Sequence, residues 1–470
     1  MGGTRRIKQL VACVVFLTAF FIVFTACGDN KAAPEAPGIK WIDPGAGFIS
    51  VRFDEAGENL YMIEAAASDG SVKCGFIDGS GEVKIPVIYD KAREFSDGVC
   101  YVELNKKKMY IDPSGNVVLD VSQYDSATSF NFGYAAVTAE TSFTTDTGYT
   151  VLYRQGIIDK SGKEIIPCEY AQAGCFENGV IWAITDANKY EIFDGSGNGL
   201  TGTEYDYIEY AGVPDLLIAT KDGKYGYIDR TGRVVIPFEY DEAYGFFDGF
   251  AVVGTDGHRG YINTKGEKLT TVEFDWAYDF SDGLAIVEKD GKYGYIDTHG
   301  NLAVPFEYDK AYNFEGGVAT VAKGSDSDGY AWFGTIDKNG KTAITPKEQG
   351  CYKWDDSYVV YYDPDAGSVE IDLDHMALLD KSGKNRLTEF SYSDIGDFTD
   401  GVAVAEQFTD DLSQYGIINQ NGAEVVPLIF DKIAIADGGK CVVQSPDADS
   451  GDNSRVGILT LPKDASTRKP

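Results

Sequence analysis

Residues that could carry acid–base, nucleophilic or metal chemistry are sparse in this sequence. There are three histidines, of which His258 and His299 fall in expected turns and His375 falls in an inserted segment. The chain has no His-x-x-His pair, no nucleophile elbow and no phosphate-binding glycine loop, the arrangements that metal, acyl-transfer and nucleotide chemistry use. We therefore expect no catalytic residue, no cofactor and no resident metal.

The strongest concentration of possible cation ligands lies between residues 363 and 374. Asp363, Asp365 and Asp374 are weak candidates for calcium ligands. An EF-hand-like loop would need Asp or Asn, Gly and Glu at its fifth, sixth and twelfth positions. This sequence has Gly367, Ser368 and Asp374 there, so a solvated acidic loop is the preferred interpretation.

A second acidic pattern repeats along the whole chain. An Asp or Asn is followed three positions later by Gly at Asp78/Gly81, Asp112/Gly115, Asp159/Gly162, Asp194/Gly197, Asp229/Gly232, Asn263/Gly266, Asp297/Gly300, Asp337/Gly340, Asp380/Gly383 and Asn419/Gly422. Asp at the first position and Gly at the fourth are typical of a type I β-turn, in which the carboxylate accepts backbone N–H groups. We expect these residues to cap hairpin turns rather than to bind calcium.

The markers belong to a tandem repeat of about 34 residues. Residues 223–255 and 291–323 are similar copies, and their markers Asp229 and Asp297 lie 68 positions apart with a more divergent copy between them. Within one unit, residues 225–228 and 234–236 flank the turn as short β-branched and aromatic runs, and residues 250–253 form a third run. The pattern predicts three strands per unit, with residues 240–244 as a linker.

The units resemble the WG-repeat, or KWG-repeat, proteins of bacteria. The resemblance rests on Gly-Lys-aromatic-Gly-Tyr-Ile-Asp, the later Ile-Pro, and Phe-x-Asp-Gly before a strand of small apolar residues, and it covers roughly residues 40–461. The signature Trp is replaced by Tyr225, Tyr293, Phe333 and Tyr415. The resemblance implies a repeat scaffold with no defined activity and supplies no catalytic residues.

We expect residues 40–461 to form an all-β array, and residues 462–470 to form a polar tail. An open, curved β-solenoid is preferred, because a propeller blade normally has four strands and 40 to 45 residues. A propeller-like ring is the alternative, since a terminal unit split between the two chain ends could close it. Irregular spacings place insertions at 141–150, 324–330 and 363–374, where binding loops commonly emerge.

Two further residue sets are expected to fill the core. Aromatic residues recur once per unit at Tyr240, Phe274 and Tyr308, and again four positions later at Tyr244, Tyr278 and Tyr312. Packing between repeats is preferred for them over a sugar-stacking ladder. Cys74, Cys100 and Cys168 replace apolar or small residues of other units, although a bond between Cys168 and Cys175 is also possible.

The first residues have the layout of an export signal. Residues 1–26 contain a basic start and an apolar stretch, and they end in Phe24-Thr25-Ala26-Cys27, which resembles a bacterial lipobox. Cys27 is the expected lipidation site, and residues 27–39 are the expected attachment segment and spacer. A transmembrane anchor is the alternative. The expected location is the cell surface or the periplasmic side of a bacterial membrane.

The net charge of the chain indicates which classes of partner it repels. The net charge is −33 at pH 7, and a field of this sign repels nucleic acid. We expect a non-enzymatic surface lipoprotein that binds a protein or a cell-envelope glycan and contacts the membrane only through its lipid. The alternative is a polysaccharide-processing enzyme or accessory with carboxylates in segments 141–150 or 363–374.

Overall fold

The computed structural model places strands along most of the chain. It describes residues 39–42, 48–57, 60–145, 148–202, 204–270, 273–325, 331–344, 351–354, 358–362, 376–379, 387–388, 391–396, 398–409, 412–436, 440–446, 454–462 and 465–467. These residues form eleven antiparallel sheets and one short 3-10 helix, η1 (Ala465–Thr467).

The sheets follow one another in chain order. The first four contain β2 (Phe48–Gly57), β3 (Leu60–Ala66), β4 (Val72–Asp78) and β5 (Val83–Tyr89); β6 (Lys91–Ala92), β7 (Cys100–Leu104), β8 (Lys107–Ile111) and β9 (Val117–Asp120); β10 (Ser126–Ala127), β11 (Tyr134–Thr145), β12 (Gly148–Asp159) and β13 (Glu164–Tyr170); β14 (Gln172–Cys175), β15 (Ile181–Ile184) and β16 (Tyr190–Phe193). The next four contain β17 (Tyr207–Tyr210), β18 (Leu216–Lys221), β19 (Lys224–Asp229) and β20 (Val234–Tyr240); β21 (Glu242–Phe247), β22 (Phe250–Thr255) and β23 (His258–Asn263); β24 (Trp276–Ser281), β25 (Leu284–Lys289), β26 (Lys292–Asp297) and β27 (Leu302–Tyr308); β28 (Lys310–Ala311), β29 (Val318–Ser325), β30 (Ala331–Asp337) and β31 (Thr342–Ile344). The last three contain β32 (Cys351–Trp354), β33 (Tyr358–Tyr362) and β34 (Met376–Leu379); β35 (Asp394–Ile395), β36 (Val402–Thr409), β37 (Leu412–Asn419) and β38 (Glu424–Phe430); β39 (Lys432–Ala436), β40 (Lys440–Pro446), β41 (Ser454–Thr460) and β1 (Ile39–Ile42).

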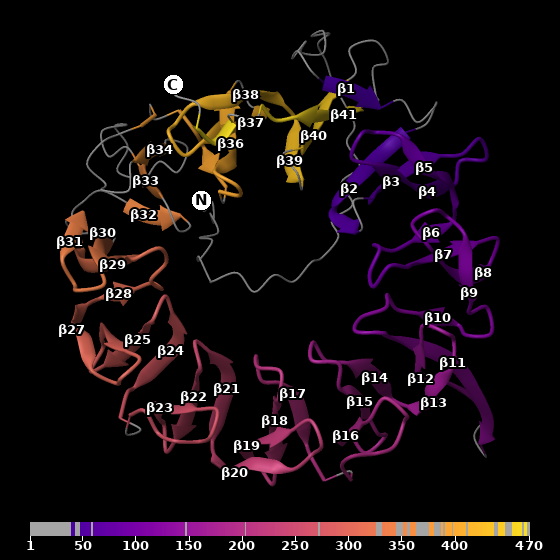
Figure 1. Cartoon of the computed structure of the whole chain (residues 1–470), viewed down its shortest axis with the longest axis horizontal. Helices are drawn as coiled ribbons and strands as arrows, with labels where there is room; N and C mark the ends of the chain where they lie inside the picture. The colour runs from indigo at the N-terminus through magenta and orange to yellow at the C-terminus, as the bar shows by residue number, and fades with distance from the viewer. Residues whose placement is uncertain are drawn as a thin grey trace, which may run out of the picture.

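The sheets are arranged around a ring (Figure 1). Within a sheet, the first strand lies nearest the centre and the last strand lies at the outer rim, as β17 and β20 show clearly. The all-β class, the tandem units and the curved array predicted from the sequence are confirmed.

The number of strands per unit differs from the sequence expectation. Eight of the eleven described sheets have four strands and three have three. The additional strand is the segment interpreted as a linker: residues after Tyr240 form β21, and β6, β10, β28 and β35 are two-residue strands at similar places. Such short strands lack the alternation of apolar and polar residues by which a strand is recognised.

One sequence unit contributes to two neighbouring sheets. In the unit at 223–255, β19 and β20 complete one sheet, whereas β21 and β22 begin the next. In this unit the chain therefore passes from one sheet to the next, and the unit does not form a sheet alone.

The two ends of the described chain meet in one sheet. β1 pairs antiparallel with β41, from Ile39 opposite Leu459 to Ile42 opposite Val456. The strands at the two chain ends therefore complete one sheet, as a terminal unit split between the ends would (Figure 1). Both this pairing of β1 with β41 and the four-stranded sheets are features of the propeller-like ring that the sequence offered as the alternative.

The close approach of the last two strands at β19 and β20 has a steric cause. β20 is an outer strand, and its register against β19 shifts near Pro237, in the edge position that proline tolerates. Gly226 faces this shift: a Cβ on Gly226 would lie 2.7 Å from the Ile236 carbonyl oxygen. The glycine after the aromatic residue thus allows the last strand to cross closely.

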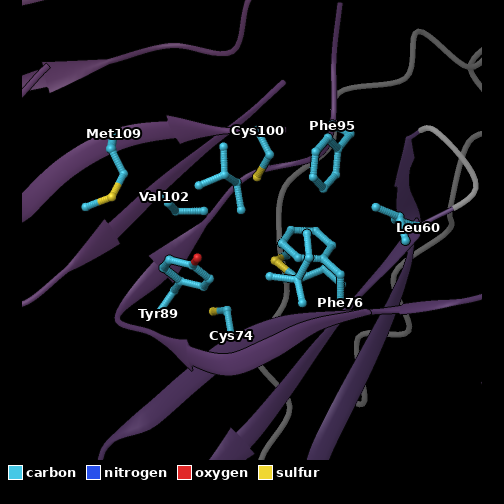
Figure 2. Packing of buried hydrophobic residues seen from close by; sticks show 11 residues of the cluster. Leu60, Cys74, Phe76, Tyr89, Phe95, Cys100, Val102 and Met109 are labelled. Carbon is cyan, nitrogen blue, oxygen red and sulfur yellow. The ribbon is translucent and has the colours of Figure 1, made fainter. Parts of the chain in front are cut away.

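The apolar core lies between successive sheets. In Figure 2, Leu60, Cys74 and Phe76 of one sheet pack against Cys100, Val102 and Met109 of the next. Cys74 and Cys100 are buried free thiols, as expected of core-filling residues. Cys168 and Cys175 are also free, so the structure contains no bond between them. Because each cluster needs two sheets, neighbouring repeats stabilise each other.

Candidate ligand-binding surface

Both described histidines are exposed: His299 lies in a turn, as expected, whereas His258 is the first residue of β23, directly after a turn. His258 Nδ1 is 3.8 Å from an Asp275 carboxylate oxygen, and His299 Nδ1 is 4.0 Å from an Asp297 carboxylate oxygen. Both neighbours are carboxylates. Across the described ranges, no group of three or more His, Cys, Asp or Glu side chains is arranged to hold a metal ion.

The hairpin aspartates cap their own turns, as predicted. Asp229 Oδ1 accepts hydrogen bonds from Thr231 N at 2.9 Å, Thr231 Oγ1 at 2.6 Å and Arg233 N at 3.1 Å. Asn263 accepts two matching backbone bonds of 3.0 Å. Partial burial acts to raise the pKa of Asp229, but the bonds from Thr231 and Arg233 outweigh it, and the pKa is lowered.

Replacing Asp229 by Ala should lower the free energy of unfolding by about 1 kcal/mol, because a carboxylate acceptor is lost. Asp229→Asn should retain most of this stability, since Asn263 makes the same bonds. Thermal melting with and without calcium tests both statements. A calcium-dependent stabilisation of the wild type that disappears in both variants would contradict the turn-cap role.

Several predicted positions lie outside the described residues. They include Cys27, the weak calcium candidates Asp363, Asp365 and Asp374, and His375. The insertion at 141–150 lengthens the hairpin of β11 and β12, which pair from Tyr134–Asp159 to Thr145–Gly148. No helix in the described ranges has the length and apolar character needed to cross a membrane.

Buried tyrosines connect four of the described sheets to the inner edge of the sheet that follows. The hydroxyls of Tyr227, Tyr261 and Tyr295 donate 2.7 Å hydrogen bonds to the carbonyl oxygens of Tyr244, Tyr278 and Tyr312 respectively. Tyr110 makes the equivalent 2.6 Å bond to Thr128. These bonds fix the backbone of the inner strands.

The aromatic residues predicted to lie in the core divide into two groups. Tyr240, Phe274 and Tyr308 are buried, as expected. Tyr244, Tyr278 and Tyr312 are exposed, so for them the core prediction is wrong. Their backbone is anchored inside the array, whereas their rings reach solvent.

The exposed rings belong to a larger set on neighbouring sheets. Six aromatic side chains with 38% to 49% exposure lie on or directly beside the first strands β17, β21, β24 and β28; we call them the aromatic row: Tyr207, Tyr244, Phe247, Trp276, Tyr278 and Tyr312. These first strands are the ones nearest the centre of the ring (Figure 1). Four consecutive sheets therefore present large aromatic side chains along their inner edges.

One member of the aromatic row is held by a charged pair. The Arg259 guanidinium lies 3.9 Å from the Trp276 ring centroid and is bound by both carboxylate oxygens of Glu242 at 2.9 Å. Arg259 also donates a 2.7 Å bond to the Asp275 carbonyl oxygen. A bidentate guanidinium has a fixed plane, so it fixes the orientation of the indole that it covers.

Carboxylates accompany the aromatic row. Tyr207 Oη donates a 2.6 Å bond to Glu209. Asp279, beside Tyr278 on β24, is half-buried, and burial raises the pKa of its carboxyl group. Burial first, and then the neighbouring Tyr278 and Glu288, raise the pKa of the Tyr293 phenol. The row therefore combines apolar faces with hydrogen-bond acceptors.

A separate hollow of about 370 Å³ lies between β6–β7 and β10. Its walls include Lys91, Arg93, Glu94, Tyr101 and Glu103. Arg93 lies 5.8 Å from the Tyr101 ring centroid, and Lys91 pairs with Glu103 at 3.3 Å. Opposite charges thus occur together here, and the hollow lacks the concentration of exposed rings found on β17–β28.

Sequence reasoning missed the aromatic row because recurrence alone does not distinguish core from surface. One signal was present: Tyr240 and Tyr244 are separated by a segment containing Asp241 and Glu242. These two charged residues indicate a solvent-facing stretch, and the ring that follows them is the exposed one.

Comparisons with solved structures show weak similarity. The chain aligns with a eukaryotic initiation factor at 11% identity and a TM-score of 0.38, covering 77% of this chain and 94% of the other. It aligns with the WD40 domain of SCAP from fission yeast at 8% identity and a TM-score of 0.22, covering 92% and 97%. Among curated proteins no sequence matches this chain.

The repeats themselves match a known family. The model of the WG containing repeat matches residues 75–107, 109–139, 156–190, 225–257, 260–293, 293–325 and 415–445. Each matched segment begins at or near the strand equivalent to β19, which contains the close-packed Gly226. The segment then extends into the next sheet. This chain is therefore a WG-repeat protein.

Proposed function

We propose that this WG-repeat protein is a non-enzymatic scaffold that binds a protein or a cell-envelope glycan on the inner strands of its ring. The observation that carries the proposal is the aromatic row, with six exposed rings on four consecutive sheets. Exposed aromatic side chains gathered in one region favour binding, because such rings supply large contact areas at low conformational cost.

The hydrogen bonds that hold the backbone behind these rings also favour binding. Tyr244, Tyr278 and Tyr312 are anchored through their carbonyl oxygens by buried tyrosines of the preceding sheet. A preorganised surface loses little entropy when it takes up a partner.

A capture experiment tests the scaffold function. The immobilised full-length protein should retain material from a cell-envelope extract, and the Tyr244→Ala/Tyr278→Ala double variant should bind it more weakly by about tenfold or more. Tyr153→Ala is the matched control, because Tyr153 is an exposed tyrosine on β12, outside the aromatic row. Equal retention by wild type and double variant would contradict the proposal.

The proposed location is the surface or periplasmic side of a bacterial membrane, with a lipid on Cys27. The support is the sequence of residues 1–27. Replacing Cys27 by Ser should abolish incorporation of a fatty-acid probe. A Cys27→Ser protein that still carries the probe would end the proposal of a lipid anchor.

A further inference from the structure

We propose that the aromatic row takes a neutral, linear glycan, which lies across the first strands of successive sheets with its sugar rings stacked on the aromatic faces. This inference rests on the scaffold function and names the class of its ligand. It depends on three properties of the inner strands: the use of their backbone groups, their charge and their spacing.

Backbone groups on the inner edge are already bonded to the preceding sheet. The Tyr244 carbonyl oxygen accepts the Tyr227 hydroxyl, and Phe246 N donates a 2.7 Å bond to the Ala211 carbonyl oxygen. An extended peptide that adds to a sheet edge needs free main-chain donors and acceptors. At β21, recognition therefore depends on side chains, which suits ring stacking better than strand addition.

The charges around the aromatic row disfavour an anionic ligand. The positive charge of Arg259 is balanced by the Glu242 carboxylate, to which it donates two hydrogen bonds, while Glu209 and Asp279 add carboxyl groups beside the rings. In a chain of net charge −33, this surface repels polyanions. Carboxyl oxygens are good acceptors for sugar hydroxyls, so a neutral glycan matches both the rings and their polar neighbours.

The spacing of the rings suits a repeating polymer. Tyr244, Tyr278 and Tyr312 occupy equivalent places on three consecutive sheets. Sheets packed face to face lie about 10 Å apart, which is close to the length of two linked pyranose rings. A linear glycan can thus meet an aromatic face at regular intervals, and affinity should rise with the number of sheets that it spans.

Titration of the full-length protein with defined oligosaccharides tests this inference. The probes are neutral linear hexasaccharides of β-1,4-glucose, α-1,4-glucose, β-1,4-mannose and β-1,4-N-acetylglucosamine, their disaccharides, and a hexamer of uronic acid. We expect at least one neutral hexasaccharide to bind, about tenfold or more tightly than its disaccharide and the uronate hexamer. Calorimetry gives the affinity, and Trp276 supplies a fluorescence signal near the ligand.

Variants connect the binding to the aromatic row. Tyr244→Ala and Tyr278→Ala should each lower the affinity for the hexasaccharide about tenfold, whereas Tyr153→Ala should leave it unchanged. If no neutral hexasaccharide binds, or if these variants bind equally well, the glycan inference is overturned. Should the double variant nevertheless lose a protein from the envelope extract, the scaffold function stands with a protein partner and only the glycan inference fails.

Discussion

A chain without residues 28–42 should melt at a distinctly lower temperature than the intact protein and should associate with itself. The deletion removes β1, the last strand of the sheet formed by β39, β40 and β41. Each ladder hydrogen bond lost between β1 and β41 costs about 1 kcal/mol. The exposed edge of β41 then becomes a template for another chain.

The matched control is a chain that lacks only residues 28–38. It retains the pairing from Ile39–Leu459 to Ile42–Val456, so its melting temperature and oligomeric state should equal those of the intact protein. Small-angle scattering should show a larger maximum dimension only for the 28–42 deletion. Equal melting temperatures for the two deletions would contradict a stabilising role for the contact between the chain ends.

Stability should also fall steeply above pH 10. Burial raises the pKa of Tyr227, Tyr261 and Tyr295 above the ordinary value of 10.0. Above that pH the unfolded chain loses these protons while the folded chain keeps them, so the unfolded state binds fewer protons and stability decreases as pH rises. Each fully shifted phenol contributes about 1.4 kcal/mol per pH unit.

Denaturant unfolding between pH 8 and pH 11.5, about the range where an ordinary tyrosine ionises, measures this loss. Replacing Tyr227, Tyr261 and Tyr295 by Phe should reduce the slope against pH by about 4 kcal/mol per unit. The control is Phe280→Leu, because the Phe280 ring centroid lies 5.1 Å from that of Tyr261 and the side chain has no ionisable group. This substitution should lower the free energy of unfolding equally at every pH. A triple Phe variant with the wild-type slope would refute the role of these phenols.

The sequence alone was sufficient to predict the structural features whose physical cause is local. The turn at Asp229 and Gly232 follows from groups within four residues of each other, so its residue types predict it. The same is true of the hairpin strands on each side and of the repeat period. The buried position of Tyr240 also followed, because a unit of this size needs an apolar contact with its neighbour.

Only the tertiary structure decided the fourth strand, the exposed rings and the meeting of the chain ends. A two-residue strand such as β28 has no periodicity and forms only because β29 lies beside it. Tyr244 and Tyr240 are the same residue type, and their different exposure depends on how neighbouring sheets pack. The pairing of β1 with β41 depends on the rotation between sheets summed around the whole array, which no local segment of sequence encodes.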